Sequence, residues 1–374
     1  MLIESQSSRE TETDEALPTT TDEWLQDMEL MHHYTTVLSK EPLLVRDVIL
    51  IPLPLSLQNV ADLWRTYIPQ QALVHAHLLH GLLAFSALNL ADLHRGTPRA
   101  APYLSICDKH QAVAIAALRD ALDGNVTEEN SASLFALAAT ISISSMARSC
   151  AVANAQTILP RFFSVEEIAE AIFLTKGMRE VTALTMGYVR DTPIRLMLTS
   201  HSLEDELGPG AEPESARLPL AVRERFEALR GMLREECKVS TPATNSSSGS
   251  DSNSDRSGAL EACEKALEEL EDIYRNLRYF KRRDRLDSGH LWRWAAMVPL
   301  PFAHQLAARH PPTLVIVAHF AAATVCLRRA WFVRDWGAYA LEGIARALEG
   351  DAGMSRWLEW PREQLGREME GVVG

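Results

Sequence analysis

Cysteine is scarce in this sequence, and the short cysteine spacings that bind zinc are missing. The 374 residues include five cysteines, and no two of them form a CxxC pair. Their wide spacing and odd number predict neither a local zinc site nor a disulfide framework. We interpret them as small buried thiols in a reducing compartment. The five are Cys107, Cys150, Cys237, Cys263 and Cys326.

An excess of positive charge, the usual mark of a DNA-binding protein, is also missing. The chain has 50 acidic and 37 basic residues, a formal net charge of −13. Because DNA is densely negative, the molecule as a whole is repelled from it at long range, and we expect no direct DNA binding. One basic run, 278–285, follows a predicted helix, and we interpret it as a solvated helix C-terminus. A nuclear-import signal and a nucleic-acid patch are the alternatives for this run.

None of the common catalytic signatures occurs. GxSxG, the P-loop, HExxH, a Rossmann fingerprint and the Asp-rich run that holds magnesium are all absent. The acidic triplet 204–206 comes nearest, but it lies beside a Gly- and Pro-rich stretch, which favours a solvated helix end. His75, His77 and His80 are two, three and five residues apart, whereas ligands of one metal on a helix need spacings of three or four. The sequence therefore predicts no metal, no cofactor and no assigned catalytic residue.

Strand signals are nearly absent, and helical periodicity dominates. The single alternating run, 45–51, stands alone, and one isolated strand cannot make a sheet. The clearest helical signal is 260–277, where apolar residues recur every three or four positions. Apolar residues make up 47% of the chain, enough for a sizeable core. We therefore expect an all-α fold, a large single helical array of about eleven helices.

Composition also divides the chain into ordered and disordered parts. Residues 1–21 are acidic and polar, without the apolar core of a signal peptide, and we predict a disordered tail. Residues 238–258 are rich in Ser, Asn, Asp and Gly, and burial there cannot offset the entropy of ordering, so we predict a disordered insertion. The helical domain is expected to span 22–370.

Three apolar stretches need to be weighed as membrane spans. Residues 73–93 are long enough, but they include three histidines, an asparagine and an aspartate. Residues 132–147 and 314–327 are shorter than the roughly 18 residues that a span requires. We interpret all three as buried helices that are apolar on most sides, and expect no membrane span.

Several strings resemble the regulatory domain of fungal zinc-cluster transcription factors of the sterol uptake control type. The first is DMELMHHYTT at 27–36, and the second is WRTYIPQQALVHAHLLHGLLAFSALNLA at 64–91. They are followed by YLSICDKHQAVAIAAL at 103–118, PPTLVIVAHFAAATVCLRRAWFVRDW at 311–336 and RWLEWP at 356–361. Together the segments place the resemblance over about 22–362, nearly the whole predicted domain.

The resemblance implies an all-α effector domain, which in that family usually follows a six-cysteine binuclear zinc cluster. Its sterol-sensing members hold a sterol in a hydrophobic pocket and dimerise, and the ligand gates nuclear entry. Here only about 21 residues precede the predicted domain, and none is a cysteine. The resemblance therefore implies a transcription regulator-like protein without the zinc cluster, in the nucleus or the cytoplasm or both. It would bind a hydrophobic, sterol-like small molecule or a partner, either a second copy or a zinc-cluster factor.

Large aromatic residues gather late in the sequence, where they form either core or the lining of a ligand cavity. An alternative function is a stand-alone enzyme of secondary metabolism, of the cyclase or isomerase type, on the same helical fold. In that case His80, His304 or His319 would be the first candidates for acid or base. The candidate ligand-pocket residues are His80, Leu83, Phe85, Trp294, His319, Trp331 and Trp336.

Overall fold

The protein is all-α in the computed structural model, which confirms the predicted class. The structure describes residues 20–40, 62–124, 126–155, 161–198, 202–210, 212–239, 250–283, 285–286 and 288–366. These ranges contain fifteen α-helices and no strand. The prediction of about eleven helices is too low, because several helices of four to eight residues carry too few apolar positions to show a period. The alternating run at 45–51 lies outside the described residues.

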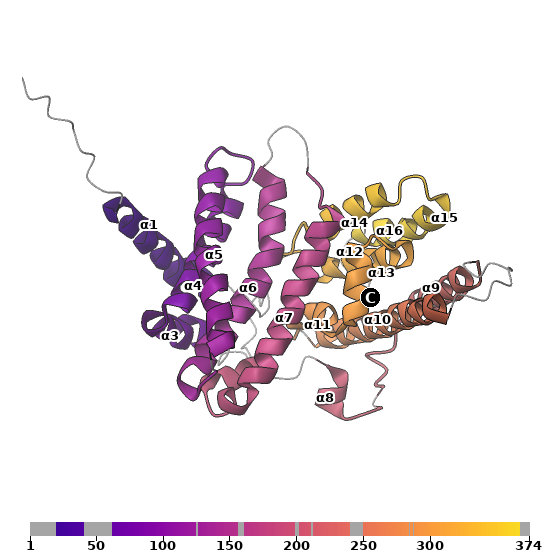
Figure 1. The fold of residues 1–374 in the computed structure, drawn as a ribbon, viewed down its shortest axis with the longest axis horizontal. Helices are drawn as coiled ribbons and strands as arrows, with labels where there is room; N and C mark the ends of the chain where they lie inside the picture. The colour runs from indigo at the N-terminus through magenta and orange to yellow at the C-terminus, as the bar shows by residue number, and fades with distance from the viewer. Residues whose placement is uncertain are drawn as a thin grey trace, which may run out of the picture.

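The first half of the chain forms an array of long helices, coloured indigo to magenta in Figure 1. Short π- and 3₁₀-turns, labelled η, connect or extend the helices. The elements are α1 (Thr20–His33), η1 (Tyr34–Leu38), η2 (Leu63–Tyr67), α3 (Ile68–Val74), α4 (Ala76–Leu93), α5 (Ala100–Gly124), α6 (Glu128–Ala155), α7 (Val165–Val189) and η3 (Pro193–Leu198).

The second half combines two long helices, α9 and α10, with shorter helices that pack around α13 and run from orange to yellow in Figure 1. Its first elements are α8 (Leu203–Leu207), α9 (Leu220–Val239), α10 (Ser250–Arg282), α11 (Ser288–Met297) and α12 (Leu300–Ala307). Then come α13 (Pro311–Ala323), η4 (Thr324–Leu327), α14 (Trp336–Ala347), α15 (Ala352–Ser355), η5 (Arg356–Leu358) and α16 (Glu359–Gly366).

Local sequence rules account for two of the long helices. At the start of α7, the Ser164 side chain accepts a hydrogen bond from the Glu167 backbone N–H, and the Glu167 carboxylate accepts one from the Ser164 N–H. This is the capping box that the spacing predicts. In α10 the predicted apolar seam is buried against the rest of the protein, with Leu260 at its half-buried start. The fully buried members are Cys263, Leu267, Leu270, Tyr274 and Leu277.

The predicted disorder needs correction at both segments. Helix α1 begins at Thr20, inside the expected tail, while residues 1–19 lie outside the described residues. Helix α9 continues to Val239 and α10 begins at Ser250, so much of the segment 238–258 has helical backbone. Composition does not predict these helix ends, because adding a few residues to a helix costs little free energy once the helix has been nucleated. Residues 240–249 lie outside the described part of the chain.

Two helices, α4 and α6, are long and apolar enough to cross a membrane. In the structure, 67% of the apolar window of α4 and 83% of that of α6 are buried inside the protein. The third stretch, α13 with η4, forms with α12 a pair bent by 104°, and every residue of α13 after Pro311 is buried. Nearly all of α13 and most of α4 and α6 are therefore buried, whereas Leu73, Val74 and Leu93, at the ends of the first stretch, are 60–76% exposed.

One hydrophobic core extends through both halves of the molecule, from α1 to η5. The halves are also joined by polar contacts: Arg334 NH2 donates to both carboxylate oxygens of Asp92 on α4, at 2.9 and 3.1 Å. The backbones approach closely at Gly343 of α14, where an added Cβ would lie 1.8 Å from the carbonyl oxygen of Phe163. Only glycine fits this contact, because any side chain would push α14 away from the segment leading into α7.

Candidate functional site

Two of the predicted pocket residues, Trp294 and Trp336, belong to a packed aromatic cluster. Trp294 stacks on Phe320 with ring centroids 4.4 Å apart, and its indole N–H donates to the Ala266 carbonyl at 2.9 Å. Trp336 meets the same phenylalanine edge-on at 5.8 Å. All three rings are at most 1% exposed. They fill the second half of the core, which is the first of the two predicted alternatives for the late aromatics.

His319 is a core histidine with both ring nitrogens engaged. Arg225 Nε donates to His319 Nε2 at 2.9 Å, and His319 Nδ1 donates to the Val315 carbonyl at 2.8 Å. The ring stacks on Trp360, with centroids 5.4 Å apart and planes 10° from parallel. Burial, aided by the positive charge of Arg225, lowers the pKa of His319 to about 3. Neutral and without a free nitrogen, His319 does not fit the acid–base role considered for it.

Leu83, Phe85 and Trp331 lie at the junction of the two halves or beside it. Leu83 and Phe85 are buried on α4, and Phe85 contacts Trp331 with ring centroids 5.4 Å apart. The indole N–H of Trp331 is buried and has no hydrogen-bond partner among the described residues. The seven predicted residues are thus distributed over several places, and a sterol-like pocket lined by them stays a prediction.

His80 belongs to a chain of three titratable side chains from three helices. His80 Nδ1 lies 2.8 Å from His110 Nδ1 on α5, and His110 Nε2 lies 3.1 Å from Asp27 Oδ1 on α1. A carboxylate can only accept, so the His110 proton lies on Nε2, and His110 Nδ1 accepts from His80 Nδ1–H. Burial lowers the pKa of His110. The chain fixes α1 against α4 and α5, while His304, the third acid–base candidate, lies exposed on α12.

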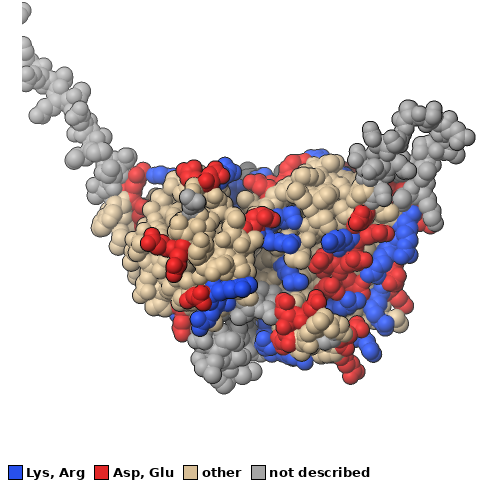
Figure 2. Space-filling view, turned by 60° about the horizontal axis from the view of Figure 1, so that its bottom comes forward, with Lys and Arg blue, Asp and Glu red and all other residues tan. Residues whose placement is uncertain are grey.

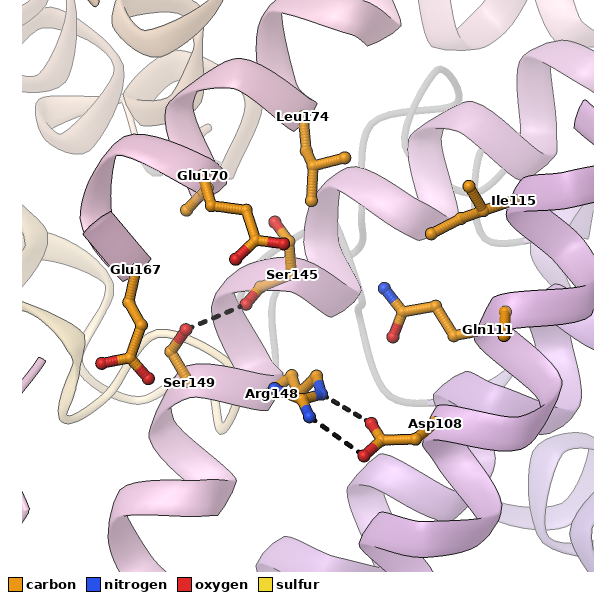
Figure 3. Close-up of a pocket in the computed structure, with 11 residues that line it drawn as sticks. Asp108, Gln111, Ile115, Ser145, Arg148, Ser149, Glu167, Glu170 and Leu174 are labelled. Carbon is orange, nitrogen blue, oxygen red and sulfur yellow. Dashed lines mark hydrogen bonds and ion pairs between the residues drawn. The ribbon is translucent and has the colours of Figure 1, made fainter. Parts of the chain in front are cut away.

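A groove of about 290 Å³ lies between α5, α6 and α7 and contains none of the predicted residues. Figure 3 shows α5 and α7 as its two walls and α6 as its floor. Both walls use one helix face, with residues spaced i, i+3, i+4 and i+7. The lining is Asp108, Gln111, Ala112 and Ile115 from α5, Ser145, Arg148 and Ser149 from α6, and Glu167, Glu170, Ala171 and Leu174 from α7.

The direction of the helices gives this groove a polar end and an apolar end. The polar end contains the ion pair of Arg148 and Asp108. Arg148 Nε and Nη2 donate to the two Asp108 carboxylate oxygens at 2.6 and 3.0 Å. Ser142 donates to Thr175 at 3.2 Å and fixes α6 against α7. Because α5 and α7 both run antiparallel to α6, Ile115 and Leu174 both lie toward the opposite end, on opposite walls (Figure 3).

The charged side chains of the groove differ in whether they have hydrogen-bond partners. Arg148 is committed to Asp108, and hydrogen bonding to that carboxylate, with a weaker contribution from Glu170, raises its pKa. Glu167 is held by the helix cap and by Arg161 at 2.7 Å. The Glu170 carboxylate has no hydrogen bond to any described residue and points toward the open space in Figure 3. The groove therefore offers hydrogen-bond acceptors in excess of donors.

Sequence reasoning missed this groove because it contains no motif. The available signal was the pair of mixed polar and apolar faces, 108–115 on α5 and 167–174 on α7. Small residues on the floor, such as Ser145 and Ser149, leave the space open. The relative register of three helices decides whether such faces meet, and a single sequence does not give that register.

The basic run 278–285 forms part of the folded surface. Arg278 is 8% exposed, the Arg283 guanidinium lies 3.5 Å from the Tyr279 ring centroid, and Arg285 pairs with Glu206 at 3.0 Å. The interpretation as a solvated helix end is therefore wrong for Arg278, which is buried, whereas the Arg285 side chain is 41% exposed while it pairs with Glu206. Figure 2 shows Lys and Arg interspersed with Asp and Glu on the face it presents.

Cys107, Cys150, Cys263 and Cys326 are free and buried. Burial raises the pKa of each thiol, to about 12 for Cys107 and to about 11 for Cys263 and Cys326. Such thiols stay protonated, whereas zinc is bound by thiolates. In the part of the chain that the structure describes, no group of three His, Cys, Asp or Glu is arranged around a metal site. Comparison with models of known protein families and with curated proteins gives no match.

Proposed function

We propose that the protein is a transcription regulator-like effector that acts without contacting DNA itself, through a bound hydrophobic small molecule or a partner protein. The negative net charge and the buried, protonated cysteines support the absence of a DNA-contacting role for this chain. The nucleus, the cytoplasm or both are the compartments that fit this role.

The observation that carries the proposal is that the segments resembling zinc-cluster factors pack against one another. The strings 27–36, 64–91 and 103–118 supply part of α1, all of α3 and most of α4 and α5, and α4 contacts the other three helices. The strings 311–336 and 356–361 supply α13, η5 and the start of α16, and His319 of α13 stacks on Trp360 of α16. Phe85, from the early strings, contacts Trp331, from the late ones. The segments that carry the resemblance therefore form one connected part of the fold.

An exposed apolar face on α1 supports a partner protein. Trp24 is 61% exposed, Leu25 54% and Met28 52%, and Trp24 and Met28 lie one turn apart on the same side of the helix. Clustered exposed apolar side chains are typical of protein–protein contact sites. The candidate partners are a second copy of the chain and a zinc-cluster transcription factor.

Gene deletion with measurement of both transcripts and metabolites tests this proposal. A regulator predicts that a set of transcripts changes on deletion, and that the wild-type gene restores it. We expect Trp24→Ser to restore it poorly, and the matched control Leu220→Ser, on α9 and equally exposed at 61%, to restore it fully. Lost metabolites with unchanged transcripts would instead establish the enzyme alternative.

A further inference from the structure

We propose that the groove between α5, α6 and α7 binds a small cationic amine with a short hydrocarbon body. This inference concerns a site and a ligand class different from those of the regulatory role. It is tested on the purified chain, so its failure leaves the transcript experiment unaffected.

The charge of the lining selects a cation. Three carboxylates, on Asp108, Glu167 and Glu170, face one guanidinium, that of Arg148. Two of these carboxylates already have arginine partners, at Arg148 and Arg161. The Glu170 carboxylate forms no hydrogen bond or ion pair with a described side chain and is only weakly attracted by the Arg148 charge, so it is the group that an incoming ammonium would bind.

The polar neighbours of Glu170 also favour an amine with several N–H donors. Ser145 and Ser149 use their own hydroxyl protons on backbone carbonyls of α6, at 2.8 and 3.3 Å, so their oxygens face the groove as acceptors. The Gln111 amide adds a carbonyl oxygen, which receives only a long contact from Cys107 at 3.8 Å, and one nitrogen donor, so acceptors remain in the majority. An ammonium has three donors and no acceptor, which matches this set better than a carboxylate or an alcohol does.

The far end of the groove fits a hydrocarbon. Ile115 and Leu174 lie on opposite walls there. Between that end and the carboxylates, the small side chains of Ala112 and Ala171 leave space in the groove. The volume of about 290 Å³ is near the lower limit of ligand pockets, which hold roughly 300–1,000 Å³. A chain of a few carbons therefore spans the distance from the apolar end to Glu170.

Isothermal titration calorimetry with n-hexylamine tests the assignment, with hexanol and hexanoate as neutral and anionic probes of the same length. Near pH 7 the amine is protonated, and we expect it to bind while hexanoate does not and hexanol binds more weakly. Glu170→Gln keeps the shape and removes the charge, and we expect it to weaken hexylamine binding roughly fivefold. The matched control Glu180→Gln lies on α7 outside the groove and should bind as the wild type does.

A second pair of variants tests the location without removing a charge. Ala112→Phe places a ring in the groove from an exposed position and should abolish binding, whereas Val113→Phe, the next residue and outside the lining, should not. Circular dichroism confirms that both variants are folded. Equal binding of hexylamine and hexanol, hexylamine binding unchanged in Glu170→Gln or Ala112→Phe, or no heat with hexylamine at its highest soluble concentration would each overturn the proposal.

Discussion

The buried histidine of α13 finds partners within the chain for both ring nitrogens, whereas polar side chains between α5 and α7 face an open space. His319 is completely buried, yet Arg225 and the Val315 carbonyl occupy both of its nitrogens. In the groove, the Glu170 carboxylate has no hydrogen bond to a described residue and interacts only weakly with the charge of Arg148. The difference indicates that the region around α13 carries stability, while the groove is free to exchange water for a ligand.

Phe320→Ala should show the largest effect on stability. The ring is fully buried and contacts Trp292, Trp294 and Trp336, so its removal leaves a cavity among large rigid side chains. We expect the free energy of unfolding to fall by about 3–5 kcal/mol in denaturant titrations. Leu300→Ala, at a residue 51% exposed on α12, is the control and should change it by less than about 0.5 kcal/mol. Similar losses in the two variants would contradict the packed core.

The buried His319 predicts a loss of stability in acid. Its pKa is about 3 in the folded protein and about 6.5 when it is free in the unfolded chain. Between these pH values the unfolded state binds the extra proton, so the contribution is complete above about pH 6.5 and is lost as the pH falls toward 3. At about pH 5 the loss amounts to about 2 kcal/mol.

The His319→Gln variant isolates this contribution, because glutamine can accept from Arg225 and donate to the Val315 carbonyl but does not titrate. Unfolding titrations at several pH values should show a shallower decline in acid for the variant than for the wild type. Parallel pH curves for the two proteins would mean that His319 is not buried in its neutral form.

A smaller effect is expected where α1 is attached. His110→Gln disturbs the chain from Asp27 to His80, and the cost should be about 1 kcal/mol, as for a buried hydrogen bond. Because this chain fixes α1, hydrogen exchange should accelerate in α1 and leave α13 protected. Uniform acceleration in both helices would mean that the chain supports the whole fold and not the attachment of α1.

Most helices and the boundaries set by caps could be predicted from the sequence, because these depend on residues close in the chain. The capping box at Ser164 and the seam of α10 are examples. The groove and the Asp27–His110–His80 chain could not, since they join residues from different helices. The chemistry of histidine makes His319 a candidate site residue in the sequence, but its partner Arg225 lies 94 residues earlier, and that contact makes His319 structural.

The most direct test of the proposed regulatory role is a fusion of the full chain to an unrelated DNA-binding domain. That domain brings the chain to a binding site upstream of a reporter gene. If the chain is an effector, the fusion protein should change reporter transcription relative to the DNA-binding domain alone. The core variant Phe320→Ala, expressed at a matched level, should lose the effect. Reporter transcription equal to that of the DNA-binding domain alone, from a folded and nuclear fusion protein, would contradict the account.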